Sequence, residues 1–323
     1  MSTMPEGAAA PPARTAATVA AGAAVRAGVV PGAVDVPSGQ PAAVPTPEPG
    51  DPRLARLSLN QATVKYWNLT QAVDGCLRAG LPAIGTWREP VAETGLAKAA
   101  ALLRRSGLRV SSHCRGGFLT GPDRAAALED NRRAVDEAAE LGSPCLVMVV
   151  GGMPDGERDL VGIRERVADG IAELAPYALE RGVRLALEPL HPMFCADRAV
   201  LSTLGQALDL AERFDAAAVG VVVDAYHVWW DPQVWEQIAR AGAGGRIASF
   251  QACDWELPIP ADALLGRGMV GDGHADVRAL RRAVDAAGYD GDIEVEIFNE
   301  RIWSADGDDV IATLARRHVQ HVL

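Results

Sequence analysis

The stretch that decides the fold is VGVVVDAYH, residues 219–227, in which an apolar run of strand length is followed by Asp224 and His227. The neighbouring segments repeat the pattern, since residues 184–191 read RLALEPLH and residues 246–251 read RIASFQ. A short apolar run bounded by polar residues is typical of a strand buried on both faces. Each segment therefore predicts a buried strand with polar side chains at its carboxyl end.

Similar apolar runs recur along the chain and alternate with segments of helical periodicity. The predicted strands are 54–60, 83–87, 108–113, 144–150, 184–188, 219–224, 246–251 and 292–297. The predicted helices are 69–79, 92–106, 124–141, 159–181, 199–213, 233–241, 277–287 and 308–318. Glycine just past a helix is a stop signal, and we assign that role to Gly80, Gly107, Gly142, Gly182, Gly242 and Gly288. Eight alternating pairs predict one (β/α)8 TIM barrel over residues 53–323, with an open doubly wound sheet as the alternative.

The first 52 residues differ from the rest in composition. They hold ten of the 21 prolines, and Ala, Gly, Ser and Thr fill most other positions. Such a segment buries too little apolar surface to offset the entropy lost on ordering. We expect residues 1–52 to form a disordered tail.

The composition disfavours several partners, and from it we expect a cytoplasmic protein. A formal net charge of −11 disfavours nucleic acid and anionic membrane surfaces. Five cysteines without a C-x-x-C pair favour a reducing compartment over a disulfide framework. We find no apolar run long enough for a transmembrane helix. Schiff-base chemistry would need Lys65 or Lys98, since these are the two lysines of the sequence.

Polar residues close four successive predicted strands: Glu188, Asp224, Gln251 and Glu296. The carboxyl ends of the strands in such a barrel meet at one mouth, where the chemistry takes place. Three carboxylates gathered there would repel one another without a cation between them. A hard divalent ion such as Mg²⁺ or Mn²⁺ would compensate, because it prefers oxygen ligands. The alternative is that the carboxylates pair with arginine, for which Arg115 and Arg267 are available.

These segments resemble the xylose isomerase-like superfamily of sugar isomerases and epimerases, the AP-endonuclease-2-type barrels, over about residues 53–318. The matching pieces are Leu-Glu188-Pro, Asp224-Ala-Tyr-His227, Gln251-Ala-Cys-Asp254, Gly271-Asp-Gly273-His-Ala-Asp276 and Gly288-Tyr-Asp-Gly291 before Glu294-Val-Glu296. Each piece is short, but their order and their places on successive strands make the joint match specific.

The resemblance implies a metal held by a Glu, an Asp, a His and a Glu. Glu188, Asp224 and Glu296 match, whereas Gln251 stands where the family usually has His. We expect Mn²⁺ in this site, with Mg²⁺ or Co²⁺ as alternatives. The resemblance also implies that Glu188 and Glu296 act as acid and base. The expected reaction is removal of a proton next to the carbonyl of a sugar, with the metal stabilising the enediolate oxygen, as in an isomerase or epimerase.

Further residues are candidates for substrate contact. The family resemblance implies that His227 contacts substrate, while a buried supporting role is the alternative. His191 is a candidate general base, or else caps its loop. Arg267 is expected to point at substrate hydroxyls or phosphate, and tryptophans near strand ends are expected to contact a sugar ring. The other candidate substrate contacts are Trp87, Trp229, Trp255, Arg115 and His113.

Other functions stay open at this point. The Glu188-Pro-Leu-His191 segment and the Trp-rich loops also resemble catalytic subunits of bacterial C-glycoside deglycosidases. That resemblance implies a lyase that cleaves the carbon–carbon bond of a 3-oxo-glucoside by β-elimination beside a small β subunit, with His191 as base. A non-catalytic sugar-binding barrel is suggested by Gln251, and DNA-repair phosphodiester cleavage is disfavoured by the negative charge. We expect a carbohydrate or glycoside as ligand and, without a β subunit, a homo-oligomer.

Overall fold

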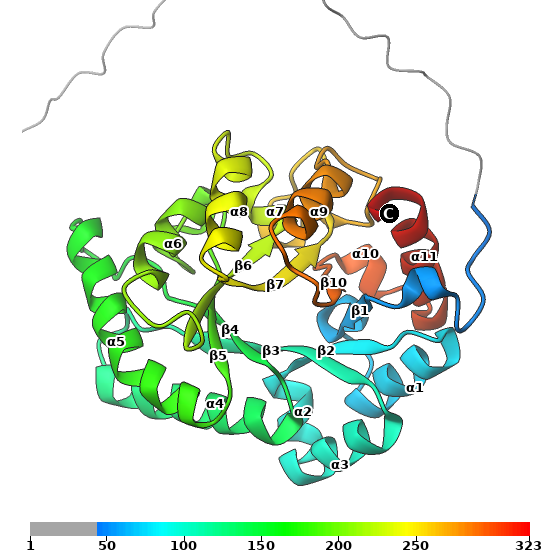
Figure 1. The fold of residues 1–323 in the computed structure, drawn as a ribbon, viewed down its shortest axis with the longest axis horizontal. Helices are drawn as coiled ribbons and strands as arrows, with labels where there is room; N and C mark the ends of the chain where they lie inside the picture. The colour runs from blue at the N-terminus through cyan, green and yellow to red at the C-terminus, as the bar shows by residue number, and fades with distance from the viewer. Residues whose placement is uncertain (1–43) are drawn as a thin grey trace, which may run out of the picture. The chain divides into compact units, whose positions relative to one another are not determined.

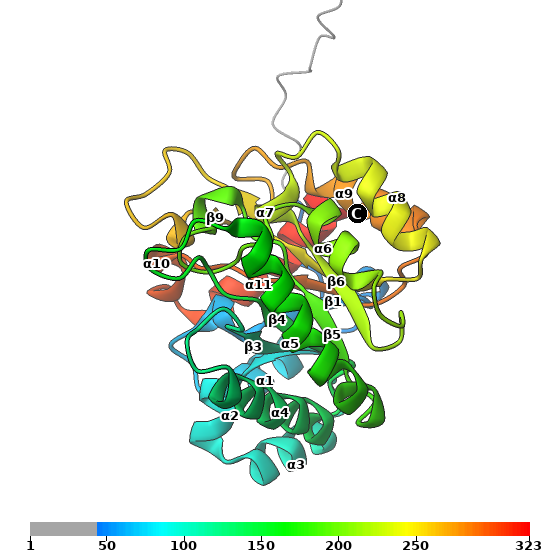
Figure 2. The ribbon, with the colours of Figure 1, turned by 90° about the vertical axis from the view of Figure 1, so that its left-hand side faces the viewer.

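The computed structural model describes residues 44–323, which form a closed barrel of parallel strands surrounded by helices (Figure 1). The strands follow one another around the barrel in the order β1-β10-β7-β6-β5-β4-β3-β2. Figure 2 shows the barrel from the side, with α5 outside β4 and β5. The predicted TIM barrel is therefore confirmed, and the open sheet is excluded.

All eight predicted strands are present in the described residues, with small shifts at their ends. The barrel strands are β1 (Leu57–Asn60), β2 (Ala83–Trp87), β3 (Arg109–Gly117), β4 (Cys145–Val149), β5 (Arg184–Leu187), β6 (Val219–Asp224), β7 (Ile247–Ala252) and β10 (Ile293–Val295). Their side chains are almost all buried because the barrel interior packs one face and the helices cover the other.

The helices of the described part lie outside the barrel or at its carboxyl end. They are α1 (Leu69–Ala79), α2 (Arg88–Thr94), α3 (Leu96–Ser106), α4 (Arg124–Leu141), α5 (Leu160–Glu180), α6 (Leu204–Ala211), α7 (Ala225–Val228), α8 (Val234–Ala243), α9 (Val277–Ala286), α10 (Glu300–Trp303) and α11 (Gly307–Arg317). The short turns are η1 (Pro52–Leu54), η2 (Gln61–Val64), η3 (Pro192–Phe194), η4 (Ala263–Leu265) and η5 (His318–Val322). No helix among these residues is long and apolar enough to cross a membrane.

Three predicted helix features are wrong for local reasons. The helix predicted at 92–106 is two helices, because Gly95 has a positive φ of 86° and separates α2 from α3. The helix predicted at 199–213 begins at Leu204, since Ala199 bridges to Gly151 in extended conformation. Gly242 does not end a helix but lies within α8, where a Cβ would come within 2.3 Å of the Ala287 carbonyl.

The predicted tail falls mostly outside the described residues. The prediction for residues 1–43 lies there, whereas residues 44–52 belong to the described unit. Pro47 is buried, and the Pro49 backbone approaches Gly80 so closely that a Cβ there would come within 2.6 Å of it.

A small hairpin beyond β7 brings one distant residue to the barrel mouth. Strand β8 (Asp254–Trp255) pairs antiparallel with β9 (Arg267–Gly268), so Trp255 lies opposite Arg267. The Asp254 carboxylate accepts hydrogen bonds from the backbone N–H groups of Gly271 and Ala275, which fixes the loop after the hairpin. This long excursion positions the Arg267 side chain above the carboxyl ends of the strands.

Candidate functional site

Three carboxylates gather at the carboxyl ends of β5, β6 and β10; we call Glu188, Asp224 and Glu296 the outer cluster. Their side chains are buried, with at most 5 % of each residue exposed. Glu188 directly follows β5, Asp224 ends β6, and Glu296 directly follows β10. Closure of the barrel makes these strand ends neighbours, so residues far apart in the sequence share one mouth. The structure thus brings together the three carboxylates that the strand ends predicted.

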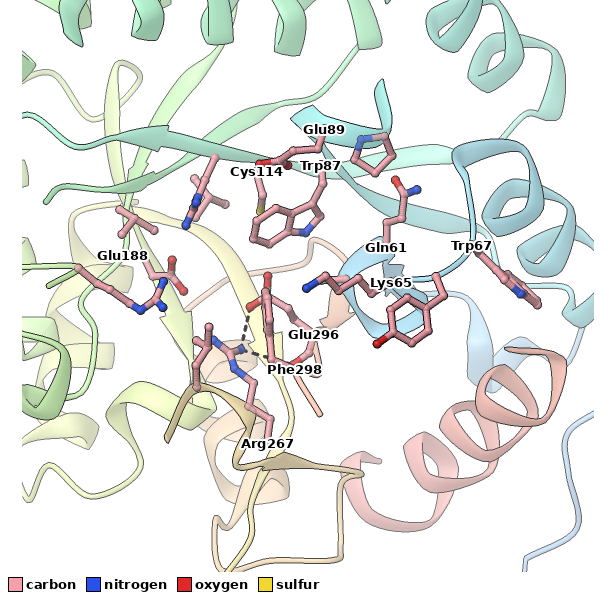
Figure 3. A pocket seen from close by; sticks show the side chains of 18 of the residues that line it. Gln61, Lys65, Trp67, Trp87, Glu89, Cys114, Glu188, Arg267, Glu296 and Phe298 are labelled. Carbon is pink, nitrogen blue, oxygen red and sulfur yellow. Dashed lines mark hydrogen bonds and ion pairs between the residues drawn. The ribbon is translucent and has the colours of Figure 1, made fainter. Parts of the chain in front are cut away.

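Arg267 is the cation that the structure places among these carboxylates. Its Nη1 atom donates to Asp224 Oδ2 at 3.0 Å and to Glu296 Oε2 at 2.7 Å. Figure 3 shows the ion pair of Arg267 with Glu296, with Glu188 to the left of Glu296. The pairing with arginine that the sequence left open is therefore present for Arg267. Arg115 instead lies with its guanidinium carbon 4.8 Å from the Phe118 ring centroid and 5.8 Å from that of Trp87.

One arginine does not neutralise three carboxylates. Burial raises the pKa of Glu188 well above its usual range, and the charges of Glu296 and Asp224 raise it further. Burial likewise raises the pKa of Glu296 to about 7, against the opposing effect of Arg267. If all three carboxylates ionise, the one guanidinium leaves two negative charges. A single divalent cation would balance them.

A second group of polar side chains surrounds Glu294 deeper in the barrel; we call Glu294, Asn60, Ser111, Ser112 and Gln251 the inner cluster. The fully buried Glu294 carboxylate accepts hydrogen bonds from Asn60 Nδ2 at 2.6 Å, Ser111 Oγ at 2.5 Å, Ser112 Oγ at 2.8 Å and Gln251 Nε2 at 3.2 Å. Gly85 on β2 leaves the space, since a Cβ there would lie 2.6 Å from the carboxylate carbon. Neutral donors thus satisfy this carboxylate without a charged partner.

Gln251 connects the inner cluster to the outer one. On β7 it pairs in register with Asp224 on one side and Glu294 on the other. Because its Nε2 donates to Glu294, its Oε1 is the free end of the carboxamide, buried and without a hydrogen-bond partner among residues 44–323. An unpaired buried oxygen beside three carboxylates fits the all-oxygen coordination of a hard divalent ion. The donor atoms of Glu188, Asp224, Gln251 and Glu296 have the chemistry of the predicted metal site, although Glu296 is paired with Arg267 and its ligand atom groups with those of Cys114 and Glu294.

His227 lies within the same site, and both of its ring nitrogens are close to hydrogen-bond donors. Glu188, Asp224 and His227 offer ligand atoms within 4.8 Å of one another. His227 Nδ1 accepts the backbone N–H of His191 at 3.1 Å, and its Nε2 lies 3.1 Å from Arg267 Nη2, a group that can only donate. Burial and the charge of Arg267 lower the pKa of His227 well below its usual range, which keeps the ring neutral. Its Nε2 also lies 3.7 Å from Asp224 Oδ2.

His191 caps a turn rather than facing the outer cluster. Its Nδ1 accepts the backbone N–H of Met193 at 3.2 Å at the start of η3. Its ring packs against Trp230 and Trp255, with centroid distances of 5.2 and 5.0 Å. Of the two roles considered for His191, the structure therefore supports the loop cap.

A cavity of about 590 Å³ opens over the outer cluster. Of the predicted substrate contacts, Trp87, Arg115, His227 and Arg267 line this cavity. The lining also contains residues that the sequence analysis did not single out for binding: Gln61, Lys65 and Tyr66 after β1, Glu89 after β2, Cys114 within β3 and Phe298 after β10. Apart from Cys114 they follow strand ends, which is the one sequence signal that pointed to them.

Three predicted substrate contacts do not line the cavity. His113 is fully buried on the outer face of β3, where its Nδ1 lies 2.9 Å from Thr86 Oγ1 and its Nε2 3.4 Å from Glu137 Oε2. Side chains alternate along a strand, so the inward position of Cys114 turns His113 toward the helices. Trp229 and Trp255 pack against each other, and Trp255 stacks on Tyr226 with ring centroids 4.7 Å apart.

Comparison with known sequences identifies relatives of the barrel. A family model described as a xylose isomerase-like TIM barrel matches residues 73–318. The 3-dehydroshikimate dehydratase of Pseudomonas aeruginosa is 31 % identical over 180 residues, which are 54 % of this chain. The match spans 26 % of that longer protein, and the Pseudomonas putida protein of the same name matches over the same share.

Solved structures share the fold along nearly their whole length. The Sinorhizobium meliloti protein SMc04130 is 48 % identical, with a TM-score of 0.80 over 83 % of this chain and 98 % of its own. A zinc-bound IolI protein has a TM-score of 0.70 at 21 % identity, covering 83 % and 98 % of the two chains. An L-ribulose 3-epimerase has a TM-score of 0.66 at 20 % identity, covering 82 % and 93 %. At these lower identities the likeness shows the fold alone.

Proposed function

The chain belongs to the xylose isomerase-like TIM barrel family, and on this premise we propose that it is a divalent-metal-dependent sugar isomerase or epimerase. Its reaction would begin with removal of a proton from the carbon next to a carbonyl group. The observation that carries the proposal is the outer cluster: three buried carboxylates beside a buried arginine, at the floor of a cavity. The epimerase among the structural neighbours is consistent with this chemistry.

The outer cluster supplies both proton-transfer groups. A general base works best when its pKa lies near the operating pH, and the pKa of Glu296 is about 7. Glu296 would remove the proton, and Glu188, the other glutamate of the outer cluster, would return a proton to the substrate. Return to the same carbon on the other face gives epimerisation, and return to the neighbouring carbon gives isomerisation.

Hydrogen-bond donors lie where negative charge would develop on the substrate. The Arg267 guanidinium faces the outer cluster, where it donates to Asp224 and Glu296, and its Nη2 lies 3.1 Å from His227 Nε2. Donors fixed in place before the reaction stabilise a developing oxyanion without reorganisation. A divalent ion held by Glu188, Asp224, Gln251 and Glu296 would add Lewis-acid polarisation of the carbonyl oxygen. Mn²⁺ is our expected ion, with Mg²⁺ or Co²⁺ as alternatives.

Elimination is a second candidate outcome of the same first step. It is favoured by the two matching curated relatives, which are dehydratases by name. In that case the proton would leave as before, and a group on the next carbon would depart instead of the proton returning. The deglycosidase form of this hypothesis loses His191 as its base, because that ring caps η3. Glu296 would take the role.

Solvent exchange in D₂O tests the proposal directly. We expect the Mn²⁺-loaded protein to incorporate deuterium next to the carbonyl of at least one ketose or 3-oxo-glycoside, as detected by NMR. Deuterium in an epimer or isomer supports the main proposal, while loss of water or of an aglycone supports elimination. Absence of exchange in all tested substrates, with metal bound, would contradict both. Size-exclusion chromatography of the same sample tests the predicted homo-oligomer and the need for a small β subunit.

A further inference from the structure

Gln61 is a buried carboxamide that the acid–base chemistry does not use. It directly follows β1 as the first residue of η2, and 1 % of it is exposed. Both its Nε2 and its Oε1 are buried without a hydrogen-bond partner anywhere in residues 44–323. Buried side-chain polar atoms are nearly always paired, so a carboxamide with both ends free indicates a group that recognises something outside the chain.

The other polar side chains beside Gln61 already have hydrogen-bond partners within the chain. Asn60 accepts the Trp87 Nε1–H at 2.7 Å and donates to Glu294 at 2.6 Å. Thr63 Oγ1 donates to the Val295 carbonyl at 2.9 Å and also accepts a backbone N–H. The polar side chains of Asn60 and Thr63, which contact the barrel, are therefore all hydrogen-bonded. Gln61 differs because it lines the cavity.

The Gln61 end of the cavity lies away from the acid–base groups. In Figure 3 Gln61 lies between Trp87 and Trp67, and Glu188 lies on the opposite side of the cavity. The indole of Trp87 is held by its hydrogen bond to Asn60 and by an edge contact with Phe298, with ring centroids 5.6 Å apart. A volume of about 590 Å³ falls within the range of ~300–1,000 Å³ for pockets that hold drug-sized ligands. A single sugar ring at the outer cluster leaves this end free.

The chemistry of this end suits a neutral hydroxylated ring. A carboxamide both donates and accepts, which matches hydroxyl groups, and fixed aromatic walls suit the faces of a ring. The charged side chains in this part of the lining balance in number, since two cations, Lys65 and Arg115, accompany two carboxylates, Glu89 and Glu93. The Lys65 ammonium is already engaged, 4.2 Å from the Trp303 ring centroid. This balance gives no excess positive charge for a phosphate or carboxylate.

We propose that the Gln61 end binds a second, hydroxylated ring of the substrate, so that the enzyme acts on glycosides in preference to free sugars. This inference rests on the proposed function for the sugar ring at the outer cluster. Gln61 would pair with a hydroxyl of the second ring while Trp87 packs against that ring. Replacing Gln61 would then weaken binding through the second ring and leave the first ring unaffected.

Calorimetric titration of five ligands into the full chain with Mn²⁺ tests the proposal. The ligands are D-glucose and its phenyl and 4-hydroxyphenyl glucosides, each glucoside in both anomeric forms. In the unchanged protein we expect the preferred phenyl glucoside to bind more tightly than glucose. We expect its 4-hydroxyl group to tighten binding by about tenfold, as one hydrogen bond can. Gln61→Met should abolish the gain from the hydroxyl, whereas the matched control Gln233→Met, an exposed position outside the cavity lining, should retain it.

Two results would overturn the inference. One is equal affinity for glucose and the glucosides in the unchanged protein, a measurement that needs no variant to fold. The other is a hydroxyl effect of the same size in Gln61→Met as in the unchanged protein. Failure of the proposed function is distinct, because it would appear as a protein that binds no Mn²⁺ and exchanges no deuterium.

Discussion

Glu294 and Glu296 lie two residues apart at the end of one strand, yet they belong to different clusters. Glu294 is surrounded by neutral hydrogen-bond donors, whereas Glu296 lies among charged side chains. The inner cluster surrounds Glu294 with four neutral donors, and this carboxylate needs no charged partner. The outer cluster leaves Glu296 with one arginine, one long hydrogen bond from Asn60 at 3.1 Å, and two carboxylate neighbours. The difference indicates that the inner carboxylate supports the barrel, whereas the outer one is held in a state that favours proton transfer and cation binding.

The largest expected effect is on activity in the outer cluster. Glu296→Gln removes the proposed base while keeping its shape. Because general-base catalysis contributes ~10²–10⁴-fold, we expect the deuterium exchange rate to fall about 10³-fold. The measurement is NMR-detected exchange on the substrate found for the unchanged protein. Exchange within threefold of the original rate would remove Glu296 from the mechanism.

A substitution in the inner cluster should instead lower the stability of the folded protein. Glu294→Gln replaces an acceptor of four hydrogen bonds by a group with one acceptor oxygen, so buried donors of Asn60, Ser111 and Ser112 lose partners. Leaving buried donors unsatisfied costs ~1–3 kcal/mol each, and we expect the free energy of unfolding to fall by about 3 kcal/mol. Urea denaturation of the metal-free proteins measures it, with Glu296→Gln as the matched control. Equal stability of Glu294→Gln and the unchanged protein would contradict the contrast between the clusters.

The outer cluster should make the metal-free protein less stable as pH rises. The pKa of Glu296 is about 7 in the folded chain and 4.5 without burial, so between these values the unfolded state loses a proton that the folded state keeps. Stability is therefore fully present below about pH 4.5 and is lost as pH rises toward 7. The shift corresponds to about 3 kcal/mol at most, and Glu188 acts in the same direction.

Urea midpoints measured from pH 4.5 to 8 check this dependence. Glu296→Gln should flatten the decline, and saturating Mn²⁺ should offset it. A decline of the same size in Glu296→Gln would show that other groups cause it.

The smallest effect is expected from the charge of Arg267. Its guanidinium lowers the pKa of Glu296, so Arg267→Gln should raise that pKa. The rise of kcat/KM with pH should then move to higher pH. A pH–rate profile checks the direction, and Arg301→Gln, which changes an exposed arginine at the end of α10, is the control. An unchanged profile would show that Arg267 does not tune the base.

The sequence predicted the barrel and the outer cluster for the same physical reason. Buried strands and their polar ends are local signals, and closure of the barrel then brings Glu188, Asp224 and Glu296 together without further information. Alternation along β3 did not assign His113, because the adjacent Ser111 and Ser112 both donate to Glu294 inside the barrel.

Other features depend on contacts that no local pattern contains. The pairing of Arg267 with the carboxylates depends on the hairpin of β8 and β9, whose two strands are separated by eleven residues. The role of His191 as a cap depends on the turn at Pro192. Gln61 was missed because a neutral side chain after a strand gives no signal until the burial of both its polar atoms is known.

Titration of Mn²⁺ into the metal-free full chain at neutral pH tests the central claim, that the outer cluster binds one divalent ion, most directly. We predict one ion bound per chain, loss of that binding in Asp224→Asn, and unchanged binding in Asp209→Asn, a control on an exposed carboxylate of α6. Absence of binding in the unchanged protein, or equal binding in Asp224→Asn, would contradict the account.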